Sequence, residues 1–251
     1  MARLDLEHIT QSFDDLVVLD DISLTVEQGQ IACLLGPSGC GKTTLFHVAA
    51  GLAEPVAGRV LLDGRDVTGQ PGQVAYMLQK DLLLQHKTIL DNVALPLILR
   101  GVPKKEARAQ ARELLDTFGL SGTEDMWPSE LSGGMRQRAA LLRSYLFSQD
   151  FMLLDEPFSA LDAFTKEDMH KWFLGVAERF GTTALIVTHD IDESIELADV
   201  VYVMRGDPQQ GVPTRILGEE PIDDCPREER DSFNLTDAFL AHKRRLLELL
   251  G

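Results

Sequence analysis

The sequence predicts an α/β fold, and three observations support this prediction. Unbroken apolar runs of strand length occur at residues 30–35, 151–154 and 183–188, and such runs are typical of central parallel strands buried on both faces. A glycine-rich loop follows the first run and leads into a segment of helix length at 44–50. A charge-rich helical pattern then occupies about 88–146, between the two halves of a strand-rich core.

The other elements follow in chain order. Residues 4–9, 17–19 and 22–26 alternate between polar and apolar side chains, which predicts three short strands. A short meander of this kind forms an antiparallel edge of a sheet. Two further strands are expected at 58–64 and 74–78. The expected fold is therefore an α/β core with an antiparallel β edge and an inserted helical subdomain.

The chain divides into a core and a tail. We expect the core at residues 1–205, with the helical subdomain inserted at about 88–148, and a tail at 206–251. The tail is rich in turn-forming and charged residues, and an amphipathic helix closes it at 238–250. Such a tail either packs on the surface or regulates the core.

Composition limits the kinds of partner. The chain has 24 basic and 40 acidic residues, a formal net charge of −16, which opposes binding to nucleic acid or to an anionic membrane surface. We see no secretory signal and no apolar stretch of the roughly 20 residues that cross a bilayer. The three cysteines, Cys33, Cys40 and Cys225, lack the spacing of a metal site or a disulfide framework.

The glycine-rich loop fits the phosphate-binding pattern G-x-x-x-x-G-K-[ST] at each fixed position. Its residues, with the first helical residue after it, are Gly36, Pro37, Ser38, Gly39, Cys40, Gly41, Lys42, Thr43 and Thr44. The glycines let the backbone approach an anion closely, and a helix N-terminus favours negative charge. Lys42 would then reach the β- and γ-phosphates of a nucleotide, and the Thr43 hydroxyl would bind Mg²⁺.

Two carboxylates end the strand at 151–154. Ligands of open parallel sheets lie at the carboxyl ends of the strands, so Asp155 and Glu156 are expected to face the nucleotide. Asp155 would hold Mg²⁺, directly or through water, and Glu156 would accept a proton from an attacking water. In isolation the pair could also be two solvated acids at a strand end.

A second glycine-containing turn opens another helix. Ser132, Gly133 and Gly134 precede the helical segment 135–146 and can offer a hydroxyl and backbone amides to an anion. One nucleotide needs only one phosphate cradle. The second helix N-terminus is therefore predicted to contact a nucleotide that another copy of the chain holds.

At these residues the chain resembles the ATP-binding subunits of ABC transporters. The resemblance covers residues 3–205 and places five motifs in the family's order. They are the phosphate loop at 36–43, the Leu-Ser-Gly-Gly signature at 131–134, Leu-Leu-Asp-Glu-Pro at 153–157, Ser-Ala-Leu-Asp at 159–162 and Thr-His-Asp at 188–190. It implies a P-loop ATPase core of the ABC type as the fold class, with ATP and Mg²⁺ as ligands.

The resemblance assigns further roles. It implies that Gln79 contacts Mg²⁺ or the attacking water and senses the permease, and that His189 donates a hydrogen bond to the γ-phosphate. Asp162 would join two ATP sites across a dimer. Phe13 would stack on adenine, although an aromatic between two strands is also a common core residue. The apolar segment 89–99 would edge a docking groove for the permease or belong to the helical core.

Local sequence narrows the branch. The signature continues as Met-Arg-Gln-Arg at 135–138, where many members have Gln in place of Met135, and it resembles nitrate, sulfonate and taurine importers. Residues 76–84 resemble members proposed to import the pyrimidine precursor of thiamine. Gln85 and His86 depart from the pattern common in those relatives.

The resemblance implies an ATPase that powers a membrane importer of a small polar solute. Its partners would be a second copy of the chain, a transmembrane permease and, through the permease, an extracytoplasmic solute-binding protein, with no nucleic acid. The chain would be cytoplasmic and peripheral on the inner face of the membrane. The alternatives are a soluble ABC ATPase of DNA repair or translation, and a regulatory subunit that binds ATP without useful turnover.

Overall fold

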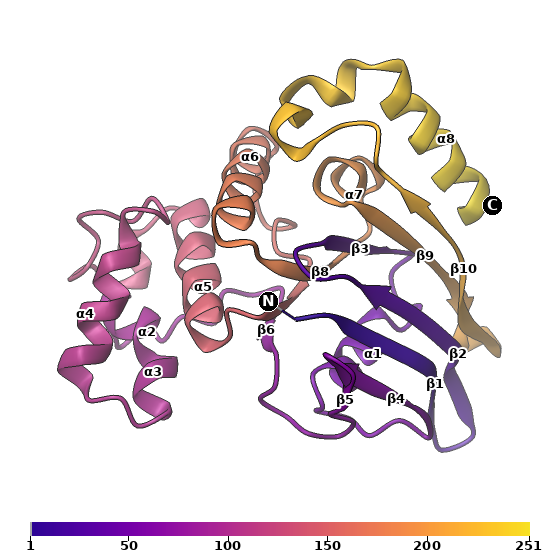
Figure 1. Cartoon of the computed structure of the whole chain (residues 1–251), viewed down its shortest axis with the longest axis horizontal. Coiled ribbons are helices and arrows are strands. Elements are labelled where there is room, and N and C mark those ends of the chain that lie inside the picture. Colours follow the sequence, from indigo (N-terminus) through magenta and orange to yellow (C-terminus); the bar gives the residue numbers. More distant parts are fainter. Residues whose placement is uncertain (1) are drawn as a thin grey trace.

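One mixed sheet runs through the molecule (Figure 1). The computed structural model describes residues 2–251, without the side chains of residues 228 and 231, and within this range ten strands pair in the order β5-β4-β1-β2-β10-β9-β3-β8-β7-β6. The strands are β1 (Leu4–Phe13), β2 (Leu16–Val26), β3 (Ile31–Leu35), β4 (Ala57–Leu62), β5 (Arg65–Asp66), β6 (Ala75–Met77), β7 (Phe151–Asp155), β8 (Thr183–Thr188), β9 (Val200–Asp207) and β10 (Val212–Pro221).

Helices cover both faces of this sheet. The α-helices are α1 (Lys42–Ala49), α2 (Ile89–Val93), α3 (Leu95–Leu99), α4 (Lys104–Leu115), α5 (Gly133–Phe147), α6 (Ala163–Phe180), α7 (Ile191–Leu197) and α8 (Asp237–Leu250). Short 3₁₀ helices occupy Pro128–Glu130, Pro208–Gln210 and Arg227–Leu235. Helices α2 to α5 form a lobe beside β6, α6 to α8 lie over one face, and α1 packs on the other (Figure 1).

The central strands are buried on both faces, as their apolar runs predict. In β3, Ile31, Cys33 and Leu35 join the core under α6 to α8, whereas Ala32 and Leu34 join the core around α1. Strand β3 pairs in parallel with β8 and with β9, and β7 pairs in parallel with β6 and with β8. The carboxyl ends of β3, β7 and β8 therefore meet at one edge of the sheet.

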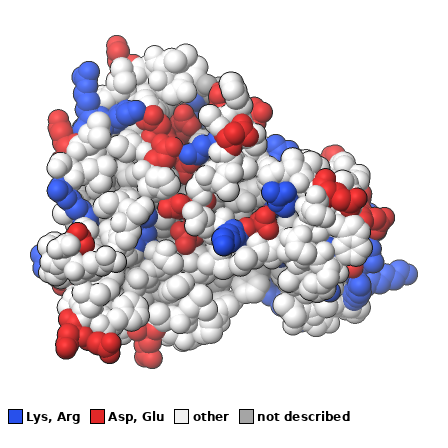
Figure 2. Space-filling model, turned by 180° about the vertical axis from the view of Figure 1, so that it is seen from behind, with Lys and Arg blue, Asp and Glu red and all other residues white. Residues whose placement is uncertain are grey.

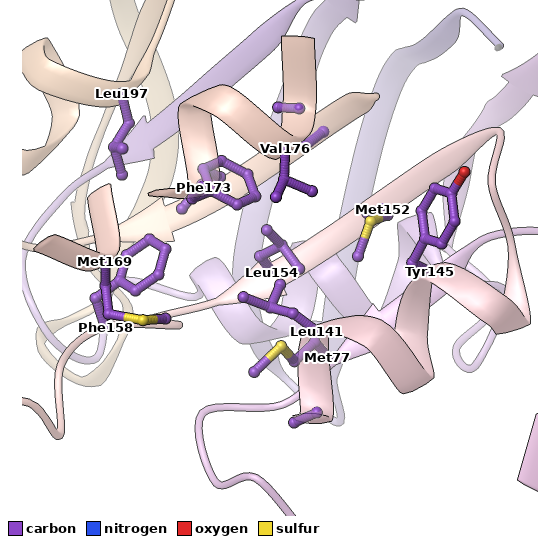
Figure 3. Packing of buried hydrophobic residues seen from close by; sticks show 14 of the residues in the cluster. Met77, Leu141, Tyr145, Met152, Leu154, Phe158, Met169, Phe173, Val176 and Leu197 are labelled. Atoms are coloured by element: carbon purple, nitrogen blue, oxygen red, sulfur yellow. The ribbon is translucent and has the colours of Figure 1, made fainter. Parts of the chain in front are cut away.

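The helical lobe is joined to the sheet by a continuous core. Figure 3 shows Leu154 of β7 between Leu141 of α5 and Val176 of α6. Full burial of such a side chain stabilises the fold by about 1.5–3 kcal/mol. Because this core links α5 to β7 and α6, the start of α5 is held in a defined position beside the central strands.

The expected antiparallel edge is confirmed, with one difference. Strand β1 pairs antiparallel with β2 and with β4. The segments 17–19 and 22–26 belong to one strand, β2, in place of two. Asp21 within it has a positive φ of 55°, and the register with β1 shifts between the pairs of Ile9 and Gln11. A bulge therefore bends a continuous strand, and its polar residues imitate a turn in the sequence.

The division between core and tail differs from the expected one. The boundary after residue 205 falls inside β9, and β10 lies in the sheet between β9 and β2. The segment 206–221, expected as a turn-rich tail, therefore forms a hairpin with β9. Pro213, Gly218 and Pro221 concealed this strand, because such residues weaken the sequence pattern of a strand. The closing helix is present as α8.

Candidate active site

The phosphate loop connects the end of β3 to the start of α1. Gly39 and Gly41 have φ angles of 83° and 100°, in the left-handed region where glycine costs least. Gly36 leaves no room for a side chain, because a Cβ there would lie 2.6 Å from the carbonyl oxygen of Met204. Within the loop, Lys42 Nζ donates to the carbonyl oxygens of Gly36 at 2.7 Å and Pro37 at 2.8 Å.

A cavity of about 290 Å³ opens over this loop. Gly41 precedes the first residue of helix α1 and offers no side-chain cap, and the first turn has no acidic residue. The N-terminal amides and the positive dipole end of α1 can therefore bind an anion. The cavity is lined by Ser38, Gly39, Gly41, Lys42, Thr43, Thr44, Asp155, Glu156 and Val187. The fold thus brings the predicted phosphate loop and both predicted carboxylates to one cavity.

Asp155 lies deep at the edge of this cavity. Its Oδ2 accepts hydrogen bonds from Thr43 Oγ1 at 3.5 Å and from Tyr76 OH at 3.4 Å. Burial, and then the neighbouring Glu156, raise the pKa of the Asp155 carboxyl above its ordinary value. Burial and the Asp155 carboxylate likewise raise the pKa of Tyr76. A cation beside Asp155 would offset both causes of the raised carboxyl pKa.

Glu156 is held by groups from three directions. Gln79 Nε2 donates to its Oε2 at 2.9 Å, and His189 Nδ1 lies 3.1 Å from its Oε1. Gln79 Nε2 also lies 3.3 Å from Ser159 Oγ, which itself donates to the Glu156 carbonyl at 2.9 Å. Glu156 has a positive φ of 45°, rare for a residue with a side chain, and its N–H donates to the Val187 carbonyl at 3.0 Å. Gln79 and His189 therefore hold the carboxylate of Glu156, and the hydrogen bond to Val187 holds its backbone at a φ that is strained for a residue with a side chain.

The oxygen atoms of Thr43 and Asp155 would suit a magnesium ion that phosphate and water also coordinate. They do not suit a metal that protein ligands alone enclose. Thr43 and Asp155 present a hydroxyl and a carboxylate oxygen next to each other. Magnesium prefers oxygen ligands and commonly takes only one or two from the protein, with phosphate and water completing the octahedron. In the part of the chain that the structure describes, no cluster of three or more His, Cys, Asp or Glu side chains could enclose a metal.

The predicted signature residues lie outside this cavity. Ser132 caps α5, its Oγ accepting from the N–H of Met135 at 3.3 Å. Ser132 and Gly133 are exposed, whereas Gly134 is buried against α6. Asp162 caps α6 in a similar way, accepting from the N–H of Thr165 at 3.1 Å. Neither cap lines the cavity over the phosphate loop.

Two other predicted residues also lie away from the cavity lining. Phe13 is at the end of β1 and is 52% exposed, so it is a surface aromatic and not a core residue. Cys40 is 1% exposed, and burial raises the pKa of its thiol. Any contact of Cys40 with a ligand would therefore come from its backbone.

The sequence matches a known protein family over more than half of its length. Residues 19–159 match the model of the ABC transporter family. The chain belongs to the ABC transporter family. This confirms the resemblance of the chain to that family.

ATP-binding proteins of several importers are similar to this chain over most of its length, including one for Fe³⁺ ions from Brucella abortus that is 43% identical over 88% of this chain and 64% of its own length. The formylaminopyrimidine import ATP-binding protein of Halalkalibacterium halodurans is 44% identical over 77% of this chain and 76% of its own length. The taurine import ATP-binding protein of Pseudomonas aeruginosa is 41% identical over 89% of this chain and 84% of its own length. The names of these two relatives match the two kinds of importer that residues 76–84 and 135–138 resemble.

Solved structures support the fold. A dimeric bacterial ABC transporter cassette superimposes with a TM-score of 0.73 at 26% identity, over 88% of this chain and all of that one. A dimeric cassette in a post-hydrolysis state, bound to ADP and inorganic phosphate, gives the same values. The predicted fold class, a P-loop ATPase core of the ABC type, is confirmed.

Two residues at this site are not predicted as site residues from the sequence. Tyr76 is predicted as part of a strand and of the segment 76–84, and Ser159 as part of a motif. Tyr76 contacts Asp155 because β6 and β7 are paired in parallel, with Tyr76 opposite Leu153. No pattern in the sequence signals this contact, whereas the position of Ser159, three residues after Glu156, could have suggested a turn.

Proposed function

We propose that this chain hydrolyses ATP and thereby powers a membrane importer of a small polar solute. The observation that carries the proposal is the carboxylate of Glu156, held by Gln79 and His189 at the cavity that the phosphate loop lines. A general base must lie within reach of the water that it activates. In this arrangement the base, its orienting partners and the phosphate cradle are already in one place.

Each residue has a distinct task in this proposal. Lys42 and the α1 amides bind the β- and γ-phosphates, and Glu156 accepts the proton of the attacking water. His189 donates to the γ-phosphate, and Gln79 orients the water. Thr43 and Asp155 would hold Mg²⁺, and the ion would supply positive charge beside the phosphate oxygens. Phe13 offers an exposed ring for stacking against adenine.

The complete ATP site needs two copies of the chain. Ser132 and Gly133 are exposed at the start of α5 and do not line the cavity over the phosphate loop, which favours contact with a nucleotide held by another copy of the chain. In a head-to-tail dimer they contact the γ-phosphate on the partner, and Asp162 lies between the two sites. Hydrolysis removes the contacts that bridge the dimer, so ATP and ADP favour different states.

An apolar groove provides a docking surface for the permease. It has a volume of about 470 Å³ and lies between the helical lobe and the sheet. Leu52, Leu82 and Leu99 line it and are 60%, 52% and 78% exposed. The predicted segment 89–99 divides here: α2 is buried in the lobe, and α3 supplies Leu95, Pro96 and Leu99 to the groove. The groove is next to Gln79, so docking there can be sensed at Glu156.

The proposed substrate class and location follow the relatives. A pyrimidine precursor of thiamine or a taurine-like sulfonate is the solute that the first relatives suggest. A permease and an extracytoplasmic binding protein would recognise it. Among the described residues no helix is long and apolar enough to span a membrane. The proposed permease partner would place the chain in the cytoplasm, attached to the inner face of the membrane.

Capture of membrane partners tests the proposal. Tagged Glu156→Gln protein, loaded with ATP, is purified from gently solubilised membranes, and its partners are identified by mass spectrometry. We expect a polytopic permease and a solute-binding protein, with hydrolysis reduced about 100-fold or more by loss of the general base. The matched variant Glu156→Gln with Leu99→Asp should lose the permease but keep ATP binding.

The outcomes separate the competing functions. Recovery of only ribosomal or DNA-associated partners would contradict transport and favour a soluble ABC ATPase. Near-normal hydrolysis by Glu156→Gln would remove Glu156 as the base. Wild-type protein that binds ATP without turnover, even with the permease present, would indicate a regulatory subunit.

A further inference from the structure

Strand β10 makes a side-chain contact with the phosphate loop. Thr214 is fully buried in β10, and its register partner in β2 is Leu19. Its Oγ1 donates a hydrogen bond to the carbonyl oxygen of Cys40 at 2.5 Å. A Cβ on Gly206, in the neighbouring β9, would collide with Thr214 Oγ1, so the hairpin fits closely around this side chain.

The Cys40 carbonyl belongs to the peptide that carries the N–H of Gly41. In a planar trans peptide, the C=O and the following N–H point in opposite directions. A donor that fixes the Cys40 carbonyl toward β10 therefore turns the Gly41 N–H away from β10. Gly41 lines the cavity and has a φ of 100°, so its own backbone preference does not fix this peptide. The hydrogen bond from the Thr214 hydroxyl restricts the orientation of this peptide group.

Neighbouring strands hold the same part of the loop from other sides. A Cβ on Gly41 would lie 2.8 Å from Val18 Cγ1 and 3.1 Å from Leu19 Cδ2, both in β2. The position of Gly36 is limited by Met204 of β9. These contacts are steric, so they limit the position of the loop backbone. The hydrogen bond from Thr214 differs from them, because it sets the orientation of one peptide group.

We propose that Thr214 is a positioning residue for nucleotide binding, acting through the Cys40 carbonyl to aim the Gly41 N–H at the phosphates. The hairpin of β9 and β10 is then part of the nucleotide site and not a separate tail. The proposal concerns ATP binding by the chain alone and does not depend on a permease or on the transported solute.

Removal of the hydroxyl without change of shape tests this role. Thr214→Val should weaken ATP binding about tenfold in a titration with labelled ATP, since a single buried donor is lost and its acceptor is left unpaired. KM for ATP should rise while kcat at saturating ATP stays within about twofold. Thr214→Ser keeps the donor and should restore both values.

Thr183→Val is the matched control. Thr183 is also fully buried, in β8, and its Oγ1 accepts from the N–H of Gly29 at 2.9 Å, far along the strand from the phosphate loop. It should lower the melting temperature by a similar amount and leave ATP affinity unchanged. Unchanged affinity of Thr214→Val, or equal weakening by Thr183→Val, would overturn the proposal. If Thr214→Val does not fold, Thr214→Cys, a poor donor of similar size, is titrated, and wild-type affinity would again overturn it.

Discussion

The two glycine-rich helix N-termini of this chain differ in what surrounds them. At α1 the amides face a cavity, no side chain caps the helix, and strands β2, β9 and β10 enclose the loop. At α5 the Ser132 hydroxyl caps its own helix, and the turn is exposed. The first terminus is complete within one chain. The second is exposed, and under the proposed function it contacts a nucleotide that another copy of the chain holds.

The largest expected effect comes from removing a side chain that would bind phosphate at the N-terminus of α1. Lys42→Ala should reduce ATP affinity by about 100-fold or more, because charge-assisted hydrogen bonds to the phosphates are lost. A titration of the isolated chain with labelled ATP measures this. Lys105→Ala, on the exposed face of α4, is the control and should bind normally. Wild-type affinity of Lys42→Ala would remove the phosphate-loop assignment.

Breaking the exposed terminus should have a different effect. Ser132→Arg should leave ATP binding of the single chain within about twofold, since Ser132 does not line the cavity. It should prevent the ATP-dependent dimer, with a loss of turnover of about 100-fold. Size-exclusion chromatography with light scattering measures the dimer, and Ser121→Arg, in an exposed loop of the lobe, is the control. A Ser132→Arg dimer in ATP would refute the composite site.

The smallest expected effect is on melting temperature, and it compares a buried carboxylate, Asp155, with an exposed one, Asp162. The pKa of Asp155 is raised by burial and by Glu156, so its ionisation opposes folding at pH values above the unfolded pKa. Asp155→Asn should therefore melt at a higher temperature than wild type at pH 7 without nucleotide, by about 2–4 °C for each kcal/mol regained. The gap should close as the pH falls through the folded pKa of Asp155, because the wild-type carboxyl then becomes neutral as well.

Asp162→Asn is the exposed counterpart. Hydrogen bonds from Thr165 lower the pKa of Asp162, so its carboxylate contributes stability at neutral pH that is lost as the pH falls through the folded pKa. This variant should melt at the same or a lower temperature than wild type. Calorimetric scans of both variants at pH 7 and pH 4.5 measure the pair, and destabilisation by Asp155→Asn would contradict the burial argument.

Much of the site was predictable because its chemistry is local. The phosphate loop needs glycines, a lysine and a threonine at fixed positions along eight residues, and a strand before it with a helix after it. The strands β3, β7 and β8 were predictable for a similar reason, since parallel strands that are buried on both faces consist of nearly continuous apolar residues. The sequence-based predictions do not include helices α6 and α7 or strands β9 and β10. They also do not include the hydrogen bond of Tyr76 to Asp155 or that of Thr214 to Cys40.

The sequence by itself determined the α/β class, the phosphate loop and the pair of carboxylates, because each depends on consecutive residues whose conformations neighbours control. Only the tertiary structure decided which distant groups meet there. Thr214 lies 174 residues from Cys40, and Gln79 lies 77 residues from Glu156. The order of strands in the sheet brings these groups together. An apolar run shows that a strand is buried, but it does not show which strand lies beside it.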